Sequence, residues 1–233
     1  MFLGGRQFAD RAQAGRELAE RLQQFADRQD VLVLALPRGG VPVAYEVARS
    51  LHVPLDVFIV RKLGVPGHEE LAMGAVASGG TRVLNQEVLS YVRVPREEIE
   101  LATRRELEEV ERREKLYRGD RPPPKIEGRT VILVDDGLAT GSTMRAAVHA
   151  LRGLGPQAVV VAVPTAAPQT CAEVGREVDE VICVMTPEPF YAVGAWYQDF
   201  AQTSDEEVRR MLRSAWEHSE TREHSKEQAD EQP

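Results

Sequence analysis

Two adjacent carboxylates follow a run of four branched aliphatic residues in the middle of the chain. The segment reads VILVDDGLATGST over residues 131–143, and the carboxylates are Asp135 and Asp136. The aliphatic run predicts a buried strand, and the small residues after it predict a turn into a helix. The beginning of a helix offers unpaired N–H groups and a positive dipole end, so we expect a phosphate there. Three hydroxyls can add donors or cap the helix: Thr140, Ser142 and Thr143.

The two carboxylates would repel a phosphate at close range, so they predict a different group beside it. Asp135 and Asp136 suit the hydroxyl donors of a sugar that lies one phosphate-length from the phosphate at the helix start, and a divalent cation held nearby. A turn with a helix cap would explain a serine or a threonine, but not two adjacent carboxylates after a buried strand. The glycine-rich loops of lysine-bearing nucleotide sites and of dinucleotide sites do not occur in the sequence. Kinase and dehydrogenase functions are therefore disfavoured.

Two other apolar runs are followed by cations. The first, Val31–Leu36, leads into Pro-Arg-Gly-Gly, where two glycines let the backbone approach a ligand and a guanidinium suits phosphate oxygens. The second, Leu55–Val60, leads into two adjacent cations and a glycine-containing loop. The first sequence predicts binding of phosphate oxygens through Arg38, Gly39 and Gly40, and the second suits a pyrophosphate through Arg61 and Lys62.

The elements that must position these residues alternate between strands and helices. Five apolar runs suit strands that are buried on both faces: Val31–Leu36, Leu55–Val60, Val131–Val134, Ala158–Val163 and Val178–Val184. Helical patterns lie among them at Gln13–Phe25, Pro42–Ser50, Ser142–Leu154 and Pro168–Glu177. This alternation predicts an α/β fold, a twisted parallel sheet with helices on both faces, over a core of about residues 31–185. Such sheets bind ligands at the carboxyl ends of their strands.

Residues 131–143 resemble the phosphoribosyl pyrophosphate (PRPP) motif of the type I phosphoribosyltransferases. In that motif a hydrophobic strand leads to paired acidic residues and a T-G-[GS]-T loop. The resemblance implies that Asp135 and Asp136 meet the ribose 2′ and 3′ hydroxyls, and that the following loop cradles the 5-phosphate. The PRPP-binding residues of this loop would be Gly137, Ala139, Thr140, Gly141, Ser142 and Thr143.

The cationic loops extend the resemblance. Arg38-Gly39 is similar to the R-G turn that binds pyrophosphate in the family, often through a cis peptide. The segment that starts Arg61-Lys62 looks like part of the adenine-type enzymes, although Val65 stands where they usually carry a further lysine. The match in this segment is therefore partial.

The implied reaction is Mg²⁺-dependent transfer of 5-phosphoribosyl from PRPP to a nitrogen acceptor such as a nucleobase, with release of pyrophosphate. Asp135, Asp136 and Arg61 would be its catalytic residues. The two aspartates would face Mg²⁺ through ribose hydroxyls or water. The implied partners are PRPP and a small-molecule acceptor, and a homodimer stays open.

An aromatic segment, Pro187–Phe200, follows the last predicted strand. Purine-specific members of the family place a hood over the base in this position, which we expect at about residues 186–203 with residues 1–12. Four side chains could contact a flat heterocycle: Phe190, Val193, Trp196 and Tyr197. The alternative is a small satellite core that packs this segment against Phe2 and Phe8.

A mobile loop that excludes water is also expected for such a reaction. Ala75–Gln86 and the charged segment Pro95–Arg118 are the two candidates. The second alternates arginine and glutamate, and the simplest interpretation is a solvated helix with intrahelical ion pairs.

The composition limits the remaining functions. The chain has 233 residues, 42% of them hydrophobic, and a net charge of −8, which disfavours nucleic acid as a main partner. Six acidic and two basic residues lie in 217–233, which we expect to be a flexible tail after a single domain at 1–216. The sequence contains two cysteines and shows neither a secretory leader pattern nor a long apolar run. We therefore expect a soluble, cytoplasmic protein without membrane contact, in which both cysteines are thiols.

An alternative function shares the same fold. Some proteins of this fold bind PRPP or nucleotides as a signal and regulate transcription, and a donor site does not distinguish them from enzymes. The balanced charges of Leu101–Tyr117 offer no basic face for nucleic acid, which favours catalysis. A hydrolase would need a positioned general base, and the sequence does not identify one.

Overall fold

The computed structural model describes residues 6–230, and its central element is a five-stranded parallel sheet in the order β2-β1-β6-β7-β8. The strands are β1 (Val31–Ala35), β2 (Leu55–Val57), β6 (Thr130–Val134), β7 (Ala158–Thr165) and β8 (Glu180–Met185). Every residue of β1 and β6 is buried, because their uninterrupted aliphatic runs have an apolar layer on each face. The predicted parallel sheet is confirmed.

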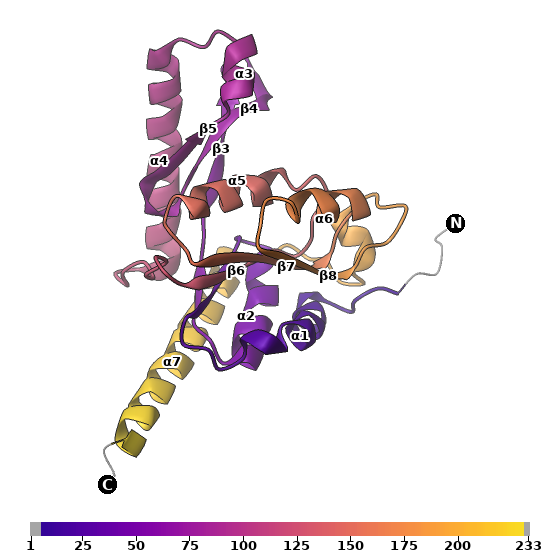
Figure 1. Ribbon diagram of the computed structural model, residues 1–233, viewed down its shortest axis with the longest axis vertical. Coiled ribbons are helices and arrows are strands. Elements are labelled where there is room, and N and C mark those ends of the chain that lie inside the picture. The colour runs from indigo at the N-terminus through magenta and orange to yellow at the C-terminus, as the bar shows by residue number, and fades with distance from the viewer. Residues whose placement is uncertain (1–5, 231–233) are drawn as a thin grey trace.

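Helices cover both faces of this sheet, as predicted (Figure 1). On one face lie α1 (Arg11–Arg21) and α2 (Gly40–Leu51), and on the other α5 (Ser142–Arg152) and α6 (Pro168–Val174). Alternate residues of β1 enter two separate cores: Val31 and Val33 pack with α1 and α2, whereas Leu32 and Leu34 pack with α5. The helices begin and end within a few residues of the predicted bounds, and the end of Gln13–Phe25 is a 3-10 turn at Gln23–Phe25.

The predicted strand Leu55–Val60 is wrong, because this apolar run serves two sheets. Strand β2 ends at Val57, and the chain then enters a three-stranded antiparallel sheet of β3 (Val60–Val65), β4 (His68–Ala77) and β5 (Thr81–Leu84). At the crossover the Ile59 N–H donates to Ser78 Oγ at 2.9 Å. The expected glycine-containing loop after Lys62 is therefore a β-hairpin.

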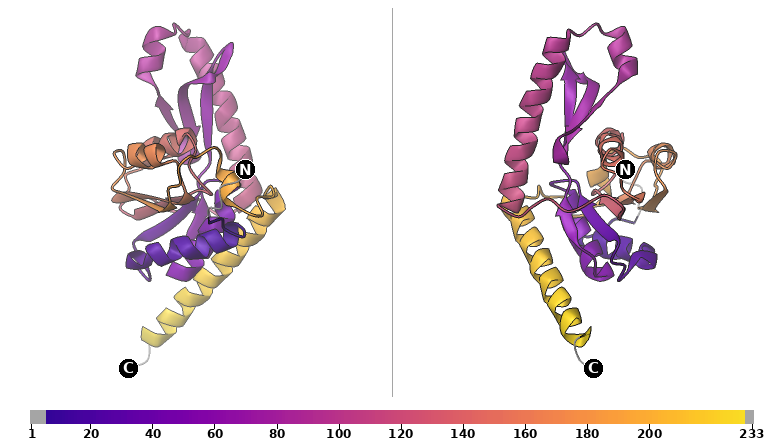
Figure 2. Two further views of the ribbon diagram at one scale, coloured as in Figure 1. Left: turned by 90° about the vertical axis from the view of Figure 1, so that its right-hand side faces the viewer. Right: turned by 60° about the vertical axis from the view of Figure 1, so that its left-hand side comes forward.

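A second lobe stands away from the parallel sheet (Figure 2). It contains β3, β4 and β5 with α3 (Gln86–Tyr91) and α4 (Arg96–Arg118). Helix α4 matches the helix expected at Pro95–Arg118 but is not simply solvated, because Val110, Tyr117 and Arg118 are buried.

Arg118 anchors the end of α4 to the parallel sheet. Its side chain is only 4% exposed; Nε donates to Asp56 Oδ1 at 2.7 Å and Nη2 to the Val57 carbonyl at 2.7 Å. Nη1 donates to Glu114 Oε1, also at 2.7 Å. Because all these groups are satisfied, the buried charge joins α4 to the end of β2.

Helix α7 (Asp205–Asp230) packs against α2 and β2 and then runs out beyond the body of the molecule (Figure 1). It continues through residues that the sequence predicts to be a flexible tail from residue 217, and its described contacts to the rest of the chain reach Arg222. Arg222 donates to the His52 carbonyl at 2.9 Å and to Asp27 at 2.8 Å. Composition did not indicate these contacts, because both partners lie about 170 or more residues away. Residues 231–233 lie outside the described part.

The two cysteines are joined. A disulfide links Cys171 of α6 to Cys183 of β8, whereas the sequence analysis expected two thiols. The two residues come from adjacent elements of the fold, and their spacing in the sequence does not indicate this contact. Within residues 6–230, no helix has the length and apolar character needed to span a bilayer.

Candidate active site

The acidic pair lies where β6 ends, as the sequence predicts. The Asp136 N–H donates to Asp135 Oδ1 at 2.8 Å, which fixes the first carboxylate against the backbone of the second. Burial raises the pKa of Asp135 well above its ordinary value, and the charge of Asp136 adds to this rise. Burial also raises the pKa of Asp136. The pair is thus a site where a hydroxyl donor or a cation would be stabilised.

The loop after the acidic pair presents backbone N–H groups at the start of α5. Gly141 caps the helix with a φ of 68°, and a Cβ there would lie 2.7 Å from Thr170 Cγ2. The first helical hydrogen bond joins Arg145 N–H to the Gly141 carbonyl. Within the described chain, the preceding N–H groups of Ser142, Thr143 and Met144 make no hydrogen bond.

These free N–H groups and the exposed hydroxyls fit a phosphate. The expectation that Thr140, Ser142 or Thr143 caps α5 is wrong, because the left-handed glycine holds that position. The Thr140 and Ser142 hydroxyls instead lie 3.3 Å apart beside the loop, and all three hydroxyl residues are exposed. Thr170 supports the loop from α6 by donating to the Ala139 carbonyl at 2.7 Å.

The loop between β1 and α2 packs directly on the acidic pair. The Pro37–Arg38 peptide is cis, as the resemblance implies. A Cβ on Gly40 would lie 2.7 Å from the Val134 carbonyl oxygen, and one on Gly39 would collide with Asp136 Oδ2. Glycine is required at both positions because the two loops touch, and this contact brings Arg38 to the edge where Asp135 and Asp136 lie.

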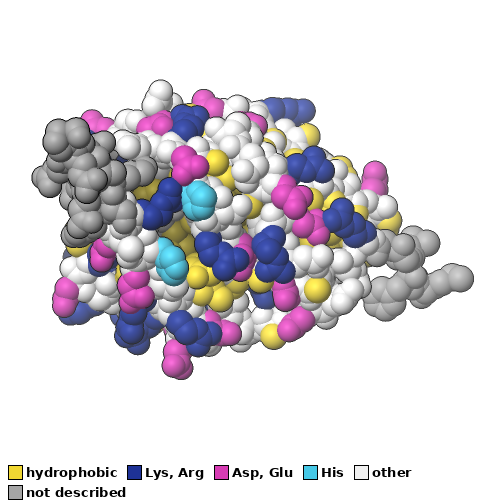
Figure 3. Space-filling view, turned by 90° about the horizontal axis from the view of Figure 1, so that it is seen from below, with side chains coloured by type: hydrophobic (Ala, Val, Ile, Leu, Met, Phe, Trp, Pro, Cys, Tyr) yellow, Lys and Arg dark blue, Asp and Glu magenta, His cyan; other side chains and the backbone are white. Residues whose placement is uncertain are grey.

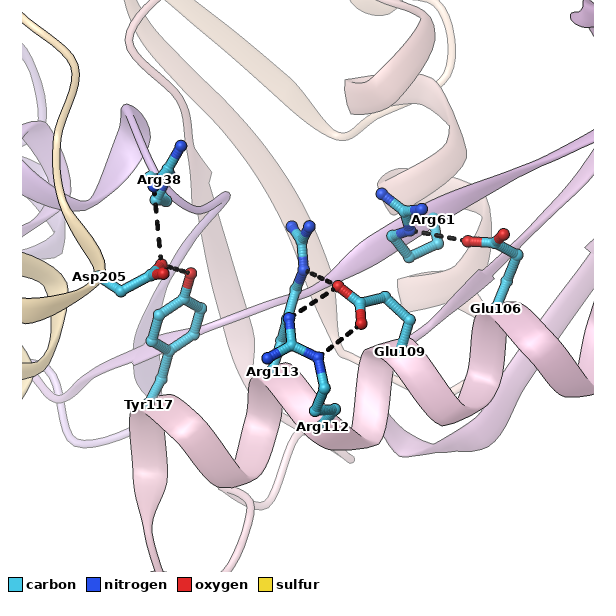
Figure 4. A network of polar contacts seen from close by, with 8 residues as sticks. All are labelled: Arg38, Arg61, Glu106, Glu109, Arg112, Arg113, Tyr117 and Asp205. Atoms are coloured by element: carbon cyan, nitrogen blue, oxygen red, sulfur yellow. Dashed lines mark hydrogen bonds and ion pairs between the residues drawn. The ribbon is translucent and has the colours of Figure 1, made fainter.

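Arg61 and Lys62 reach the site from β3, not from a loop after β2. They pair with Val76 and Ala75 of β4, and Arg61 Nε donates to Glu106 of α4 at 2.8 Å. Figure 4 shows Arg61 beside Glu106 of α4, and Arg38 near Tyr117, further along the same helix. Because they are consecutive residues of one strand, the side chains of Arg61 and Lys62 point to opposite faces of this sheet, and their secondary structure differs from the prediction.

Arg11 is a site residue that sequence reasoning missed. It lies on α1, and its Nε and Nη2 approach Asp136 Oδ2 at 2.9 and 2.8 Å. Its Nη1 donates to the Ala201 carbonyl at 2.7 Å, and its guanidinium lies 3.9 Å from the centre of the Phe200 ring. This ion pair opposes the effect of burial and lowers the pKa of Asp136. No local sequence signal distinguishes Arg11 from the other arginines of α1.

The segment expected to form the hood contacts the beginning of the domain. Phe8 exchanges backbone hydrogen bonds with Trp196 and Gln198, and its ring lies 5.5 Å from that of Tyr197. The Tyr197 hydroxyl donates to the Asp136 carbonyl at 2.6 Å, and burial raises the pKa of this hydroxyl. Tyr197 therefore occupies the satellite core of the alternative interpretation. Phe2 lies outside the described residues.

The other acceptor candidates lie nearer the loop surface. The Phe190 and Trp196 rings are stacked with centroids 6.3 Å apart, and Val193 packs so closely on Gly137 that a Cβ there would lie 2.6 Å from Val193 Cγ1. Two polar atoms at this place are buried without a hydrogen-bond partner in the described structure: Trp196 Nε1 and Thr165 Oγ1. Val193 thus joins the aromatic segment to the loop after the acidic pair.

The donor set for a cation consists of two carboxylates. Among residues 6–230 no cluster of three or more acidic, histidine or cysteine side chains could hold a metal. Mg²⁺ usually binds one or two carboxylates together with substrate phosphates, and Asp135 and Asp136 match this pattern. The residues fit a metal that arrives with a phosphorylated ligand, not one in a cage made by the protein alone.

A cavity of about 600 Å³ lies at the opposite edge of the sheet, among residues that precede β1, β2 and β6. Figure 3 shows this face, where cationic side chains surround an apolar floor. Three of its arginines are paired with carboxylates: Arg28 with Asp30, Arg49 with Glu46, and Arg222 with Asp27. The cavity is separate from the acidic pair and its loops.

Comparison with known proteins identifies the arrangement. The family model for the phosphoribosyl transferase domain matches residues 6–186. A protein of Mycobacterium tuberculosis strain H37Rv, provisionally named a phosphoribosyl transferase, is 47% identical over 205 residues. That match covers 88% of this chain and 46% of the relative, so the chain spans about half the length of that relative. The crystal structure of TT1426 from Thermus thermophilus is 44% identical with a TM-score of 0.80, over 88% of this chain and 97% of that one.

Proposed function

The chain belongs to the phosphoribosyl transferase domain family, and on this premise we propose that it transfers 5-phosphoribosyl from PRPP to a nitrogen acceptor. One observation carries the proposal: three phosphate- or diol-binding groups converge at one edge of the parallel sheet. They are the N–H groups at the start of α5, the acidic pair, and Arg38 of the β1–α2 loop, while Arg61 and Lys62 lie on β3 of the second lobe. Their chemistry matches the 5-phosphate, the ribose diol and the pyrophosphate of one molecule.

The acidic pair would orient the sugar. Asp135 and Asp136 accept hydrogen bonds from the 2′ and 3′ hydroxyls of the ribose, while the start of α5 holds the 5-phosphate at the other end of the sugar. Both carboxylates have raised pKa values because they are buried, so a bound cation or two hydroxyl donors would stabilise their charge. Holding both ends of the sugar positions C1 for attack, which lowers the entropic part of the barrier.

The cations would stabilise the leaving group. The bond between C1 and the pyrophosphate oxygen breaks and takes its electron pair, a bond forms from the acceptor nitrogen to C1, and the acceptor releases one proton. Arg38 and Arg61 offer donors to pyrophosphate oxygens, and Lys62 lies next to Arg61 on β3. When bound, Mg²⁺ neutralises charge on the pyrophosphate, and Asp135 and Asp136 would hold it through water or the ribose hydroxyls.

The acceptor would lie beneath the hood. Phe190 and Trp196 present a stacked aromatic pair, and Val193 packs on the PRPP loop, which favours a flat heterocycle such as a nucleobase. Tyr197 is left out of this subsite because its ring is buried against Phe8. The buried Trp196 N–H is a candidate donor to the acceptor if the hood moves.

Two assays test the proposal. Calorimetric titration with PRPP and Mg²⁺ compares the wild type with Asp135→Asn/Asp136→Asn, and with Asp120→Asn as a control for an exposed carboxylate in the turn after α4. We expect the double variant to lose PRPP binding and the control to retain it. Pyrophosphate release is then measured over purines, pyrimidines and amine acceptors.

The outcomes separate the functions. Unchanged PRPP binding in the double variant would contradict the assignment of the acidic pair. Tight PRPP binding with no pyrophosphate release for any acceptor would contradict transfer and favour a PRPP-binding regulator. Release of pyrophosphate without an acceptor would instead indicate a hydrolase.

A further inference from the structure

Three arginines from three different elements face the same space beside the candidate pyrophosphate site. Figure 4 shows Arg38 of the β1–α2 loop and Arg61 of β3 with Arg113 of α4 between them. The guanidinium of Arg113 points away from its helix into the gap between the other two. The sequence predicts intrahelical ion pairs for the charges of this helix.

Arg61 and Arg113 are held by carboxylates in the same manner. Glu106 accepts from Arg61 Nε at 2.8 Å, and Glu109 accepts from Arg113 Nε at 2.7 Å. In neither case do the terminal amino groups make a hydrogen bond within the described structure. A guanidinium fixed through Nε presents its two terminal amino groups as a fork, which matches two oxygens of a phosphate.

The neighbouring arginine of the same helix differs in this respect. Arg112 uses both Nε and Nη2 on Glu109, at 2.7 and 3.0 Å. Its side chain is 62% exposed, against 32% for Arg113. Arg112 thus neutralises Glu109, and the two arginines together lower the pKa of that carboxyl to about 2. Because Arg112 can keep Glu109 paired, Arg113 can engage a ligand without leaving a carboxylate uncompensated.

The helix that carries Arg113 is fixed in place near Arg38. Tyr117, one turn further on, donates to Asp205 Oδ1 at 2.6 Å, and the same oxygen lies 3.9 Å from Arg38 Nη1. Arg118 then binds Asp56 at the end of β2. The position of Arg113 relative to the β1–α2 loop is therefore set by contacts on both sides of α4.

From these contacts, and resting on the proposed function, we propose that Arg113 binds the pyrophosphate group of PRPP together with Arg38 and Arg61. Helix α4 then forms a wall of the site that supplies a cation. Pyrophosphate carries several negative charges, and three forked cations can bind its oxygens from three directions. The charged helix thereby has a second use besides its intrahelical pairs.

The test compares two variants that remove the same charge from the same helix. Arg113→Met and Arg112→Met each leave Glu109 with one arginine, and inorganic pyrophosphate with Mg²⁺ is the ligand for calorimetric titration. We expect Arg113→Met to weaken pyrophosphate binding by about 10-fold or more, as for loss of a charge-assisted hydrogen bond. Arg112→Met is expected to change it by less than about 2-fold, because the Arg112 side chain is exposed to solvent and spends its contacts on Glu109.

Three results would overturn the inference: no binding of pyrophosphate by the wild type, wild-type affinity in Arg113→Met, or an equal loss in Arg112→Met. If Arg113→Met does not fold, Arg113→Lys takes its place and should show an intermediate loss, since it keeps the charge without the fork. Pyrophosphate binding needs no acceptor. A protein that binds it through Arg113 but transfers nothing would refute the proposed transfer and leave this inference standing.

Discussion

Replacing Arg11 with methionine tests whether the ion pair to Asp136 organises the acidic pair. Methionine keeps an apolar side chain against Phe200 but removes both contacts to Asp136 Oδ2, at 2.8 and 2.9 Å, and the 2.7 Å bond to the Ala201 carbonyl. The change therefore leaves Asp136 without its cation at a position where burial already disfavours a charge.

The expected cost follows from burial. Arg11 and Asp136 are 11% and 15% exposed, and removal of one partner from a fully buried pair costs about 3–5 kcal/mol. Because this pair is not fully buried and Asp136 can take up a proton, we expect a loss of about 2–3 kcal/mol at neutral pH. For a chain of this size that loss lowers the unfolding midpoint by about 4–12 °C.

The sign of the pH dependence separates charge from packing. The folded-state pKa of Asp136 is raised, so this carboxyl contributes stability at low pH that is lost as pH rises through the folded pKa. Removing Arg11 raises that pKa further, so the variant loses more stability than the wild type as the pH rises. The difference in the free energy of unfolding should therefore grow between about pH 4 and about pH 8.

Urea unfolding across this pH range measures the difference, with Arg16→Met as the control. Arg16 lies on the same helix, is 54% exposed, and its Nη1 is 3.8 Å from Glu46, so its removal should cost less than about 1 kcal/mol. PRPP titration should show weaker binding by Arg11→Met, most clearly at low pH, where its Asp136 is protonated. A loss of stability that is the same at every pH would refute the reasoning and assign Arg11 a packing role only.

Three further outcomes are expected. Asp135→Asn keeps an acceptor for the Asp136 N–H but removes a carboxyl whose pKa is raised by burial. Calorimetry should therefore show a higher unfolding midpoint than that of the wild type at pH 7, and no gain near pH 3. Equal midpoints at pH 7 would contradict this expectation. Arg118→Met should cost about 3–5 kcal/mol in urea unfolding because it leaves Asp56 buried without its cation, and a cost below about 1 kcal/mol would show that the pair is dispensable. Gly40→Ala places a Cβ 2.7 Å from the Val134 carbonyl oxygen. The variant should therefore lose about 1–3 kcal/mol of stability and bind pyrophosphate more weakly. Wild-type affinity for pyrophosphate would show that the β1–α2 loop can shift.

The sequence predicts the parts of the site that depend on local order. Asp135, Asp136 and the loop to Thr143 follow one strand and begin one helix, so a continuous pattern encodes them. The same holds for Arg38 and its glycines after β1. In each case the strand, the turn and the helix start are neighbours in the chain, and the parallel sheet brings the strand ends together.

Contacts between distant segments could not be predicted in this way. Arg11 and Asp136 are 125 residues apart, and no pattern relates them. The run Leu55–Val60 is apolar throughout, so periodicity cannot show that β2 ends at Val57 and that the chain changes sheets. The charge pattern of α4 predicts a solvated helix face, because the sequence does not show that Arg38 and Arg61 lie opposite Arg113.

Helix α7 ties the two edges of the parallel sheet to each other. Its first residue, Asp205, lies 3.9 Å from Arg38, and Arg222, about 26 Å further along the helix at about 1.5 Å per residue, holds the carbonyl of His52 at the end of α2. Helix α2 begins at Gly40, directly after Arg38 and Gly39. The β1–α2 loop, α2 and α7 are therefore connected to one another at both ends of α2. A genetic screen for suppressors of defects at Arg38 should therefore return changes near Arg222, on the far side of the molecule.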